Sequence, residues 1–256
     1  MTSFPDHFSA TAADYAAFRP HYPDALFDWV AGHAPARRLA WDCGAGSGQA
    51  AVALARRFAF VVATDASRAQ LERATRDPRV GYAAMTAERP ALAAAWFDLV
   101  TVAQALHWFD RDAFFREATR VLAPGGFLAA WTYGPMELTD ERAPIAYDFY
   151  ARTVGPYWPP ERSLVDTGYG AIAFPFDEVR APEMWMEHRW TLRETLGYVS
   201  TWSAVQVYRK QRGEDPLPLL AAALAPAWGD PEARHLVRWP LRVRAGHRRD
   251  GCVSHR

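Results

Sequence analysis

Five short apolar runs lie between residues 38 and 132, separated by segments whose apolar residues recur at helical spacing. Continuous apolar runs of this length are typical of strands that are covered on both faces. Strands that alternate with helices predict an α/β fold with a doubly wound, mostly parallel sheet. The predicted strands are Arg38–Cys43, Phe60–Thr64, Val80–Ala84, Phe97–Ala103 and Phe127–Thr132, and the predicted helices between them are Gly48–Arg57, Arg68–Arg76 and Arg111–Leu122.

The pattern changes after residue 133. Residues 134–182 are rich in proline and aromatic residues without a clean period, so they predict a helical and irregular, cap-like insertion. Because no stretch reads as a linker, we expect a single domain over residues 1–245, followed by a disordered tail at 246–256. The other predicted elements are helices at Ala10–Ala31, Ile145–Thr153, Leu192–Gln211 and Leu217–Ala227, and strands at Met184–Thr191 and His235–Arg244.

The charge of the chain is balanced, with 29 basic and 29 acidic residues among 256. There is no excess of positive charge with which to neutralise phosphates, so we expect no nucleic-acid partner. Lys210 is the only lysine. A Gly-rich phosphate loop therefore has no lysine available, which excludes a P-loop nucleotidase.

The number of cysteines and the length of the apolar runs indicate in which cellular compartment the protein is expected. Two cysteines, Cys43 and Cys252, cannot form a disulfide framework, which favours a reducing cytoplasm. The first residues lack the features of a signal peptide, and runs such as Phe58–Ala63 are far shorter than the roughly 18 residues of a membrane span. The cluster Glu187-His188-Arg189 lacks metal-ligand spacing on a strand, so we predict no metal site.

A glycine-rich turn, Asp42-Cys43-Gly44-Ala45-Gly46-Ser47-Gly48, connects the first predicted strand to the helix after it. Glycines allow a tight turn and a close approach of the backbone to a ligand, and the following helix offers free N–H groups. Asp65 ends the next strand, where a carboxylate can accept both hydrogen bonds from a ribose diol. The unit therefore predicts a nucleoside site.

The kind of nucleoside depends on Asp42. Gly46-x-Gly48-x-x-Ala51 fits a loose dinucleotide pattern, so a nicotinamide-dependent oxidoreductase is one alternative. Asp42 would repel a pyrophosphate, whereas it would attract an ammonium group. S-adenosylmethionine carries an ammonium group and an adenosine but no phosphate. A non-catalytic module that binds this compound is a second alternative.

These segments resemble the class I S-adenosylmethionine-dependent methyltransferases. Asp42-x-Gly44-x-Gly46-x-Gly48 is similar to the first motif of that family, and Asp65 to the acid that holds the ribose. Thr86-Ala87-Glu88 resembles the segment beside the adenine, where most members carry Asp in place of Thr86. Phe97-Asp98-Leu99-Val100 and Arg120-Val121-Leu122-x-Pro124-Gly125-Gly126 resemble the fourth strand and the turn before the fifth.

The resemblance implies a Rossmann-like methyltransferase fold with a seven-stranded sheet over a core at residues 38–132. It implies S-adenosylmethionine as the cofactor, with S-adenosylhomocysteine as the product. Tyr15-x-x-x-Arg19, Ala103–Phe109 and Thr201-Trp202-Ser203 resemble the branch that includes trans-aconitate methyltransferase. The cofactor residues implied are Tyr15, Arg19, Asp42, Gly44, Ala45, Gly46, Gly48, Asp65, Ala66, Thr86, Ala87, Glu88, Gln104 and Trp108.

The methyl acceptor is expected to be a small organic molecule, and the branch suggests a carboxylate. A carboxylate needs no catalytic base, whereas an amine, phenol or carbon nucleophile does. His107 follows the fourth strand and could be a base, a hydrogen-bond partner of the substrate, or a structural residue. We expect a monomer or a homodimer, with an acceptor pocket lined by His107, Trp131, Tyr133, Arg189 and Trp202.

Overall fold

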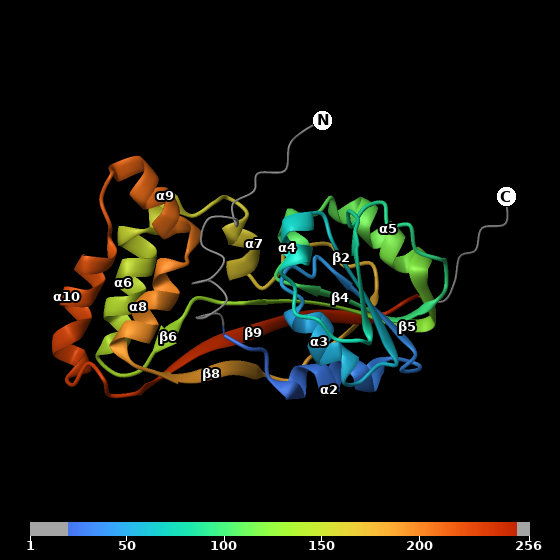
Figure 1. Cartoon of the computed structure of the whole chain (residues 1–256), viewed down its shortest axis with the longest axis horizontal. Helices are drawn as coiled ribbons and strands as arrows, with labels where there is room; N and C mark the ends of the chain where they lie inside the picture. Colours follow the sequence, from blue (N-terminus) through green and yellow to red (C-terminus); the bar gives the residue numbers. More distant parts are fainter. Residues whose placement is uncertain (1–19, 250–256) are drawn as a thin grey trace. The chain divides into compact units, whose positions relative to one another are not determined.

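The computed structural model describes residues 20–249, which group into two compact units (Figure 1). The sheet unit comprises residues 22–134, 163–184 and 241–249, and the helical unit comprises residues 20–21, 135–162 and 185–240. Residues 163–184 therefore group with the predicted nucleoside-binding segment. A single domain with a cap at 134–182 stays a prediction.

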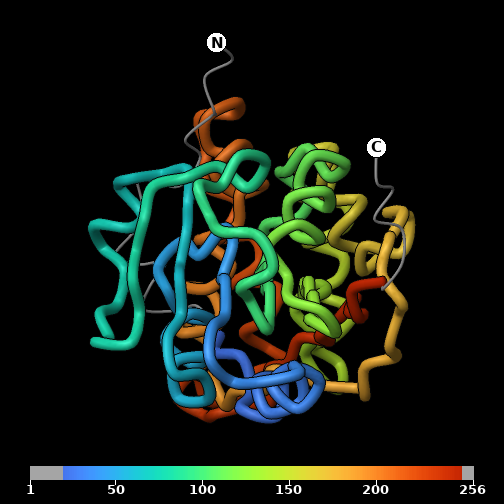
Figure 2. The backbone as a smooth tube through the Cα atoms, turned by 90° about the vertical axis from the view of Figure 1, so that its right-hand side faces the viewer, coloured from blue at the N-terminus to red at the C-terminus, as the bar shows by residue number. Residues whose placement is uncertain are grey.

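Five parallel strands form the centre of the sheet unit, in the order β3-β2-β1-β4-β5. In Figure 2 the backbone of this part of the chain is coloured from blue to green. Two antiparallel strands complete this unit, with β9 paired to β5 and β7 paired to β9. The bounds are β1 Leu39–Cys43, β2 Phe60–Asp65, β3 Val80–Ala84, β4 Phe97–Ala103, β5 Leu122–Tyr133, β7 Asp177–Val179 and β9 His235–His247.

The fold is Rossmann-like, as predicted. In all, the sheet has nine strands among the described residues rather than seven, because β6 (Glu137–Leu138) and β8 (Met184–Trp190) also pair with β9. β9 continues through His247, and Arg248 N donates to Gly126 O at 2.8 Å. The predicted boundary at residue 245 is therefore wrong, because Gly246 and His247 belong to β9 and pair with β5.

Burial of β4 explains why its sequence is apolar. Six of its seven residues are buried, as expected for a strand covered on both faces. The helices and short turns of the sheet unit are α2 Asp24–His33, α3 Gln49–Ala55, α4 Arg68–Glu72, η1 Leu106–Trp108, α5 Arg111–Val121 and α7 Arg162–Asp166. α2 begins directly after Pro23, and the first part of the helix predicted at Ala10–Ala31 lies outside the described residues.

The helical unit consists mainly of helices (Figure 1). Aromatic rings gather within it, since the ring of Trp202 lies 5.6 Å from that of Tyr150 and 6.0 Å from that of Tyr198. α10 packs against both α6 and α8. The helix predicted over Leu192–Gln211 is wrong as one element, because Trp202 is extended and its buried ring lies 5.6 Å from that of Tyr150. The elements are α6 Arg142–Asp148, η2 Phe149–Thr153, η3 Gly155–Tyr157, α8 Leu192–Ser200, α9 Ser203–Arg212 and α10 Leu217–Trp228.

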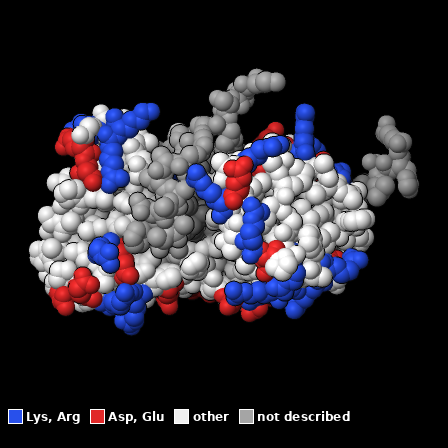
Figure 3. Space-filling view, in the orientation of Figure 1, with Lys and Arg blue, Asp and Glu red and all other residues white. Residues whose placement is uncertain are grey.

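Charged side chains of both signs lie near one another on the face shown in Figure 3. Arg57 illustrates the pairing, because its guanidinium contacts Asp28 at 2.7 Å and Asp24 at 3.0 Å. Within the part of the chain that is described, no helix has the length and apolarity required to span a membrane.

Candidate functional site

The glycine-rich turn begins at the end of β1, and its three glycines have φ angles of +72°, +51° and +79°. A Cβ on Gly44 would lie 2.6 Å from Ala105 Cβ, and one on Gly48 would lie 2.2 Å from Tyr82 Oη. At Gly46 a Cβ would meet no atom of the described residues within 4 Å. Packing thus requires the first and third glycines, while the backbone at Gly46 borders open space that a ligand can approach.

Asp42 is fully buried at the end of β1. Its Oδ1 accepts a hydrogen bond from Thr101 Oγ1 at 2.8 Å, whereas Oδ2 is buried without a partner in the described structure. Burial raises the pKa of Asp42 to about 7, and the charge of Asp65 acts in the same direction, whereas the hydrogen bond from Thr101 opposes this shift. A cationic donor at Oδ2 would satisfy this oxygen and favour the carboxylate.

Asp65 lies at the end of the neighbouring strand, β2. Its Oδ2 accepts a hydrogen bond from Gly46 N at 2.9 Å, and its Oδ1 accepts one from Ser67 N at 2.8 Å. Each carboxylate oxygen has a second lone pair, so the group is fixed in position and can still accept hydrogen bonds from a diol. Ala66 follows and is exposed.

The segment after β3 contains Thr86, Ala87 and Glu88. Thr86 is exposed and Ala87 is buried, while Glu88 Oε1 accepts a hydrogen bond from the backbone N–H of Asp110 at 3.1 Å. This contact connects the segment to the turn between η1 and α5. The chain carries no carboxylate at Thr86, so only a hydroxyl is available at that position.

The loop after β4 contains Gln104, His107 and Trp108. It lies beside the glycine turn, since Ala105 would clash with a side chain at Gly44. Gln104 has a φ of +56°, a conformation that costs a non-glycine residue about 1–3 kcal/mol and is common at functional sites. Gln104 N donates to Trp131 O at 2.9 Å, and its Oε1 accepts a hydrogen bond from Thr132 Oγ1 at 2.7 Å.

Sequence reasoning missed Tyr169. This side chain is fully buried, and its Oη lies 3.0 Å from Nδ1 of His107. Burial raises the pKa of its phenol above the usual range. Tyr169 belongs to the aperiodic stretch predicted as an insertion, where the flanking Gly168 and Gly170 were the only signal of a tight turn.

The residues predicted to line the acceptor pocket divide between the two units. Trp131 and Tyr133 lie on β5 in the sheet unit, and Trp131 is fully buried with an Nε1 that lacks a partner among the described residues. Arg189 and Trp202 lie in the helical unit. Arg189 is exposed and its carbonyl accepts a hydrogen bond from Arg234 at 2.8 Å, while Trp202 is part of that unit's aromatic core.

The sheet unit thus contains fifteen of the nineteen predicted site residues: Asp42, Gly44, Ala45, Gly46, Gly48, Asp65, Ala66, Thr86, Ala87, Glu88, Gln104, His107, Trp108, Trp131 and Tyr133. Tyr15 and Arg19 lie outside the described residues. No group of three His, Cys, Asp or Glu side chains that could hold a metal ion is found among residues 20–249.

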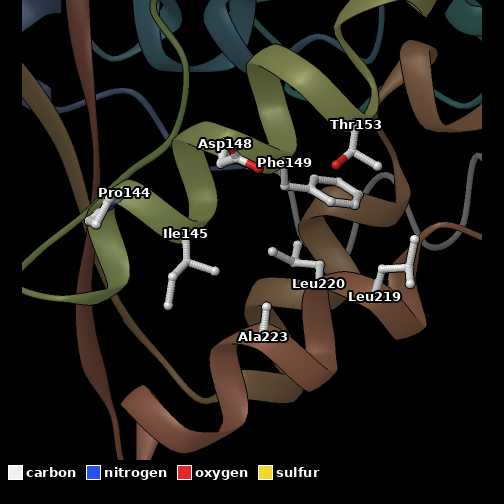
Figure 4. Close-up of a pocket in the computed structure, with 8 residues that line it drawn as sticks. All are labelled: Pro144, Ile145, Asp148, Phe149, Thr153, Leu219, Leu220 and Ala223. Carbon is white, nitrogen blue, oxygen red and sulfur yellow. The ribbon is translucent and has the colours of Figure 1, made fainter.

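A separate cavity of about 370 Å³ lies in the helical unit, between α6, η2 and α10 (Figure 4). Its lining is mostly apolar, and none of the predicted site residues within 20–249 belongs to it. The lining residues are Pro144, Ile145, Asp148, Phe149, Thr153, Leu219, Leu220 and Ala223.

Comparisons with known proteins agree with this geometry. The family described as "Methyltransferase domain" matches residues 41–130. A candidate methyltransferase from Dictyostelium discoideum is 36% identical over 231 residues, covering 89% of this chain and 88% of that protein. A candidate type II methyltransferase from Anaeromyxobacter dehalogenans, whose structure is solved, is 46% identical with a TM-score of 0.87 and covers 91% of this chain and 100% of its own.

The matched segment contains the glycine turn, Asp65 and the loop after β4, and the relatives cover most of the chain. The family implies S-adenosylmethionine as the methyl donor. The unpartnered oxygen of Asp42 and the open space at Gly46 fit a ligand that carries an ammonium group. The alternatives of a nicotinamide-dependent oxidoreductase and of a non-catalytic module are therefore not retained, and the chain belongs to the class I S-adenosylmethionine-dependent methyltransferases.

Proposed function

We propose that this enzyme methylates a carboxylate of a small organic acid, as its resemblance to the branch that includes trans-aconitate methyltransferase suggests. The observation that carries the cofactor side of the proposal is the buried, unpartnered Oδ2 of Asp42 beside the glycine turn. An ammonium group would satisfy this oxygen, whereas a pyrophosphate would be repelled by it. The acceptor side is supported by the uncharged hydrogen-bonding groups at the ends of β4 and β5.

Most of the proposed cofactor roles belong to residues of the sheet unit. Asp42 would hold the ammonium group, and Asp65 would accept the hydrogen bonds of the ribose. Ala66, Thr86, Ala87 and Glu88 would border the adenosine. The backbone of the glycine turn, with Gly44, Ala45, Gly46 and Gly48, would approach the cofactor closely. The proposal adds Gln104 and Trp108 from the loop after β4, and Tyr15 and Arg19 from the segment before residue 20.

When bound, S-adenosylmethionine supplies a methyl group on a sulfonium, which the acceptor takes up by in-line displacement. The protein's task is to align the acceptor and to exclude water. Holding two reactants in line can lower a barrier by roughly 7–11 kcal/mol without any acid or base. The fixed positions of Asp42 and Asp65 on neighbouring strands suit this task, because their carboxylates are held by hydrogen bonds of 2.8–2.9 Å.

A carboxylate acceptor is already a nucleophile at neutral pH, so its methylation requires no proton transfer. In this proposal His107 contacts the acceptor by hydrogen bonding. Trp131, Tyr133, Arg189 and Trp202 remain the predicted lining of the acceptor pocket. A cytoplasmic location and a monomeric or homodimeric state also remain predictions.

The test is methyl transfer from labelled S-adenosylmethionine to a panel of small molecules, with the purified protein. The panel contains trans-aconitate and other small di- and tricarboxylic acids, together with amines and phenols of similar size. We expect label in base-labile methyl esters of the acids. Asp42→Asn should lose this activity at limiting cofactor, whereas Glu214→Gln, an exposed change in the helical unit, should retain it. Label only in amines or phenols would contradict the proposed acceptor.

A further inference from the structure

Two hydrogen-bonded pairs of polar residues lie at the carboxyl ends of β4 and β5. Thr132 Oγ1 donates to Gln104 Oε1 at 2.7 Å, and His107 Nδ1 lies 3.0 Å from Tyr169 Oη. Gln104 and His107 belong to the same loop after β4, which brings the two pairs to one segment. The family's glycine turn lies beside this segment, because Ala105 packs against Gly44.

The position of Tyr169 is fixed by its backbone. Its φ is +64°, which side-chain-bearing residues rarely adopt. Its N–H donates to Leu164 O at 2.8 Å, and its carbonyl accepts a hydrogen bond from Arg244 Nη1 at 2.8 Å. Arg244 is itself paired with Glu178. These contacts hold the phenol against His107, and a strained conformation that is retained in this way indicates a role at the site.

The phenol of Tyr169 stays protonated at physiological pH. Burial raises the pKa of Tyr169 well above its usual range. A buried hydroxyl proton needs an acceptor, because leaving it unpaired is costly.

The surroundings of the phenol oxygen indicate where its proton goes. Nδ1 of His107 lies 3.0 Å from the phenol oxygen, within hydrogen-bond distance. The hydroxyl proton of the neighbouring Thr132 is donated to Gln104 Oε1. An imidazole nitrogen is a more basic acceptor than a hydroxyl oxygen, so the phenol proton is expected to go to Nδ1.

We propose that Tyr169 is a positioning residue, which donates its hydroxyl proton to Nδ1 of His107 and so holds the imidazole as the Nε2–H tautomer. In this tautomer Nε2 is a hydrogen-bond donor and is not available as a general base. This inference rests on the proposed function. The Nε2–H of His107 would donate a hydrogen bond to the acceptor carboxylate, which accepts hydrogen bonds and has no proton to lose. An acceptor that must be deprotonated would find no base at this nitrogen.

The experiment is NMR of the histidine rings in the full-length protein labelled with ¹⁵N, at pH 7.5 and without any ligand. The signals of His107 are identified by their loss in His107→Gln. We expect the Nδ1 of His107 to show the shift of an unprotonated ring nitrogen, and Nε2 that of a protonated one. A proton on Nδ1, or an equal mixture of tautomers, would overturn the proposal.

A variant separates the role of the hydroxyl from that of the ring. Tyr169→Phe should retain the ring and remove the donor, so that His107 loses its single tautomer. Tyr208→Phe is the matched control, because it removes a phenol hydroxyl in the helical unit, where the ring of Tyr208 packs on Tyr157 at 4.9 Å. It should leave the His107 signals unchanged. An unchanged tautomer in Tyr169→Phe would overturn the role of Tyr169.

The NMR result and the result of the methyl-transfer panel can be interpreted separately, even if a variant fails to fold or the acceptor is another compound. The measurement on the unmodified protein requires neither Tyr169→Phe nor a substrate, so it decides the tautomer by itself. Failure of the methyl-transfer panel would contradict the proposed acceptor and leave the tautomer result standing.

Discussion

Two buried aspartates on neighbouring strands of the sheet differ in how many of their carboxylate oxygens accept hydrogen bonds from the described protein. Asp98, on β4, has its oxygens occupied by Arg38 N at 2.9 Å, Leu39 N at 3.2 Å and Arg38 Nη2 at 2.9 Å. Asp42, on β1, has one oxygen occupied by Thr101 and one without a partner in the described structure. Both side chains are fully buried.

This difference separates a structural carboxylate from one that is available to a ligand. Asp98 connects the start of β4 to the start of β1, at the edge of the sheet opposite the carboxyl ends of the strands. Asp42 lies at the carboxyl end of β1, where ligands bind in open α/β sheets. Burial alone therefore does not tell a structural carboxylate from one that is available to a ligand. The number of its hydrogen-bond positions that are filled by the protein does.

The largest expected effect is on stability and comes from Asp98. Asp98→Asn removes the charge that accepts two backbone hydrogen bonds, and we expect the free energy of unfolding to fall by about 3 kcal/mol. Denaturation with urea measures this change. The dissociation constant for S-adenosylhomocysteine, measured by calorimetry on the folded variant, should remain within about twofold. A large loss of affinity would contradict the structural assignment of Asp98.

The matched change at Asp42 should act on binding. Asp42→Asn removes the negative charge and should weaken S-adenosylhomocysteine binding by about 2 kcal/mol, or roughly 30-fold. The free energy of unfolding should change less than in Asp98→Asn, because the unpartnered oxygen contributes no hydrogen bond within the described protein. Equal affinity in the variant and in the unmodified protein would break the comparison.

The comparison is sharpened by measuring S-adenosylhomocysteine binding as a function of pH in the unmodified protein and in Asp42→Asn. The pKa of Asp42 is raised to about 7, and an ammonium group favours the carboxylate, so binding should release a proton from Asp42. Affinity for S-adenosylhomocysteine should therefore rise about fivefold between pH 6 and pH 7 and level off above that range, following the ionised fraction. In Asp42→Asn this rise should disappear. A flat profile in the unmodified protein would show that Asp42 does not titrate with binding.

The smallest expected effect is at Thr86. A carboxylate accepts a hydrogen bond from an adenine amino group more strongly than a hydroxyl does. Thr86→Asp should therefore tighten S-adenosylhomocysteine binding by about 1 kcal/mol, or roughly fivefold. Thr86→Val, which removes the hydroxyl at similar size, is the control and should weaken binding. Affinity that is identical in all three proteins would exclude a contact between Thr86 and the adenine.

The periodic part of the sequence predicted the fold best. The strands and helices between residues 38 and 132 follow from apolar runs and turn residues, and the parallel order of the strands agrees with that pattern. The glycine turn and Asp65 could be found because their roles depend on local chain geometry. Prediction failed where no period existed, as in the stretch that contains Tyr169.

Other differences arise from packing that sequence spacing does not encode. Tyr169 contacts His107 across 62 residues, and nothing local to either residue indicates the contact. The ring of Trp202, which is predicted to line the acceptor pocket, packs among aromatic side chains of the helical unit that are distant from it in the sequence. Asp42 and Asp98 look alike in the sequence, since each is an acid within an apolar strand. Their hydrogen-bond partners become known only when the strands are paired.

The most direct test of the account is a crystal structure of the protein with S-adenosylhomocysteine. The account predicts that the ammonium group of the ligand lies within hydrogen-bond distance of Asp42 Oδ2 and that the ribose hydroxyls contact Asp65. A ligand bound away from the glycine turn, or bound there with Asp42 Oδ2 still unpartnered, would contradict it.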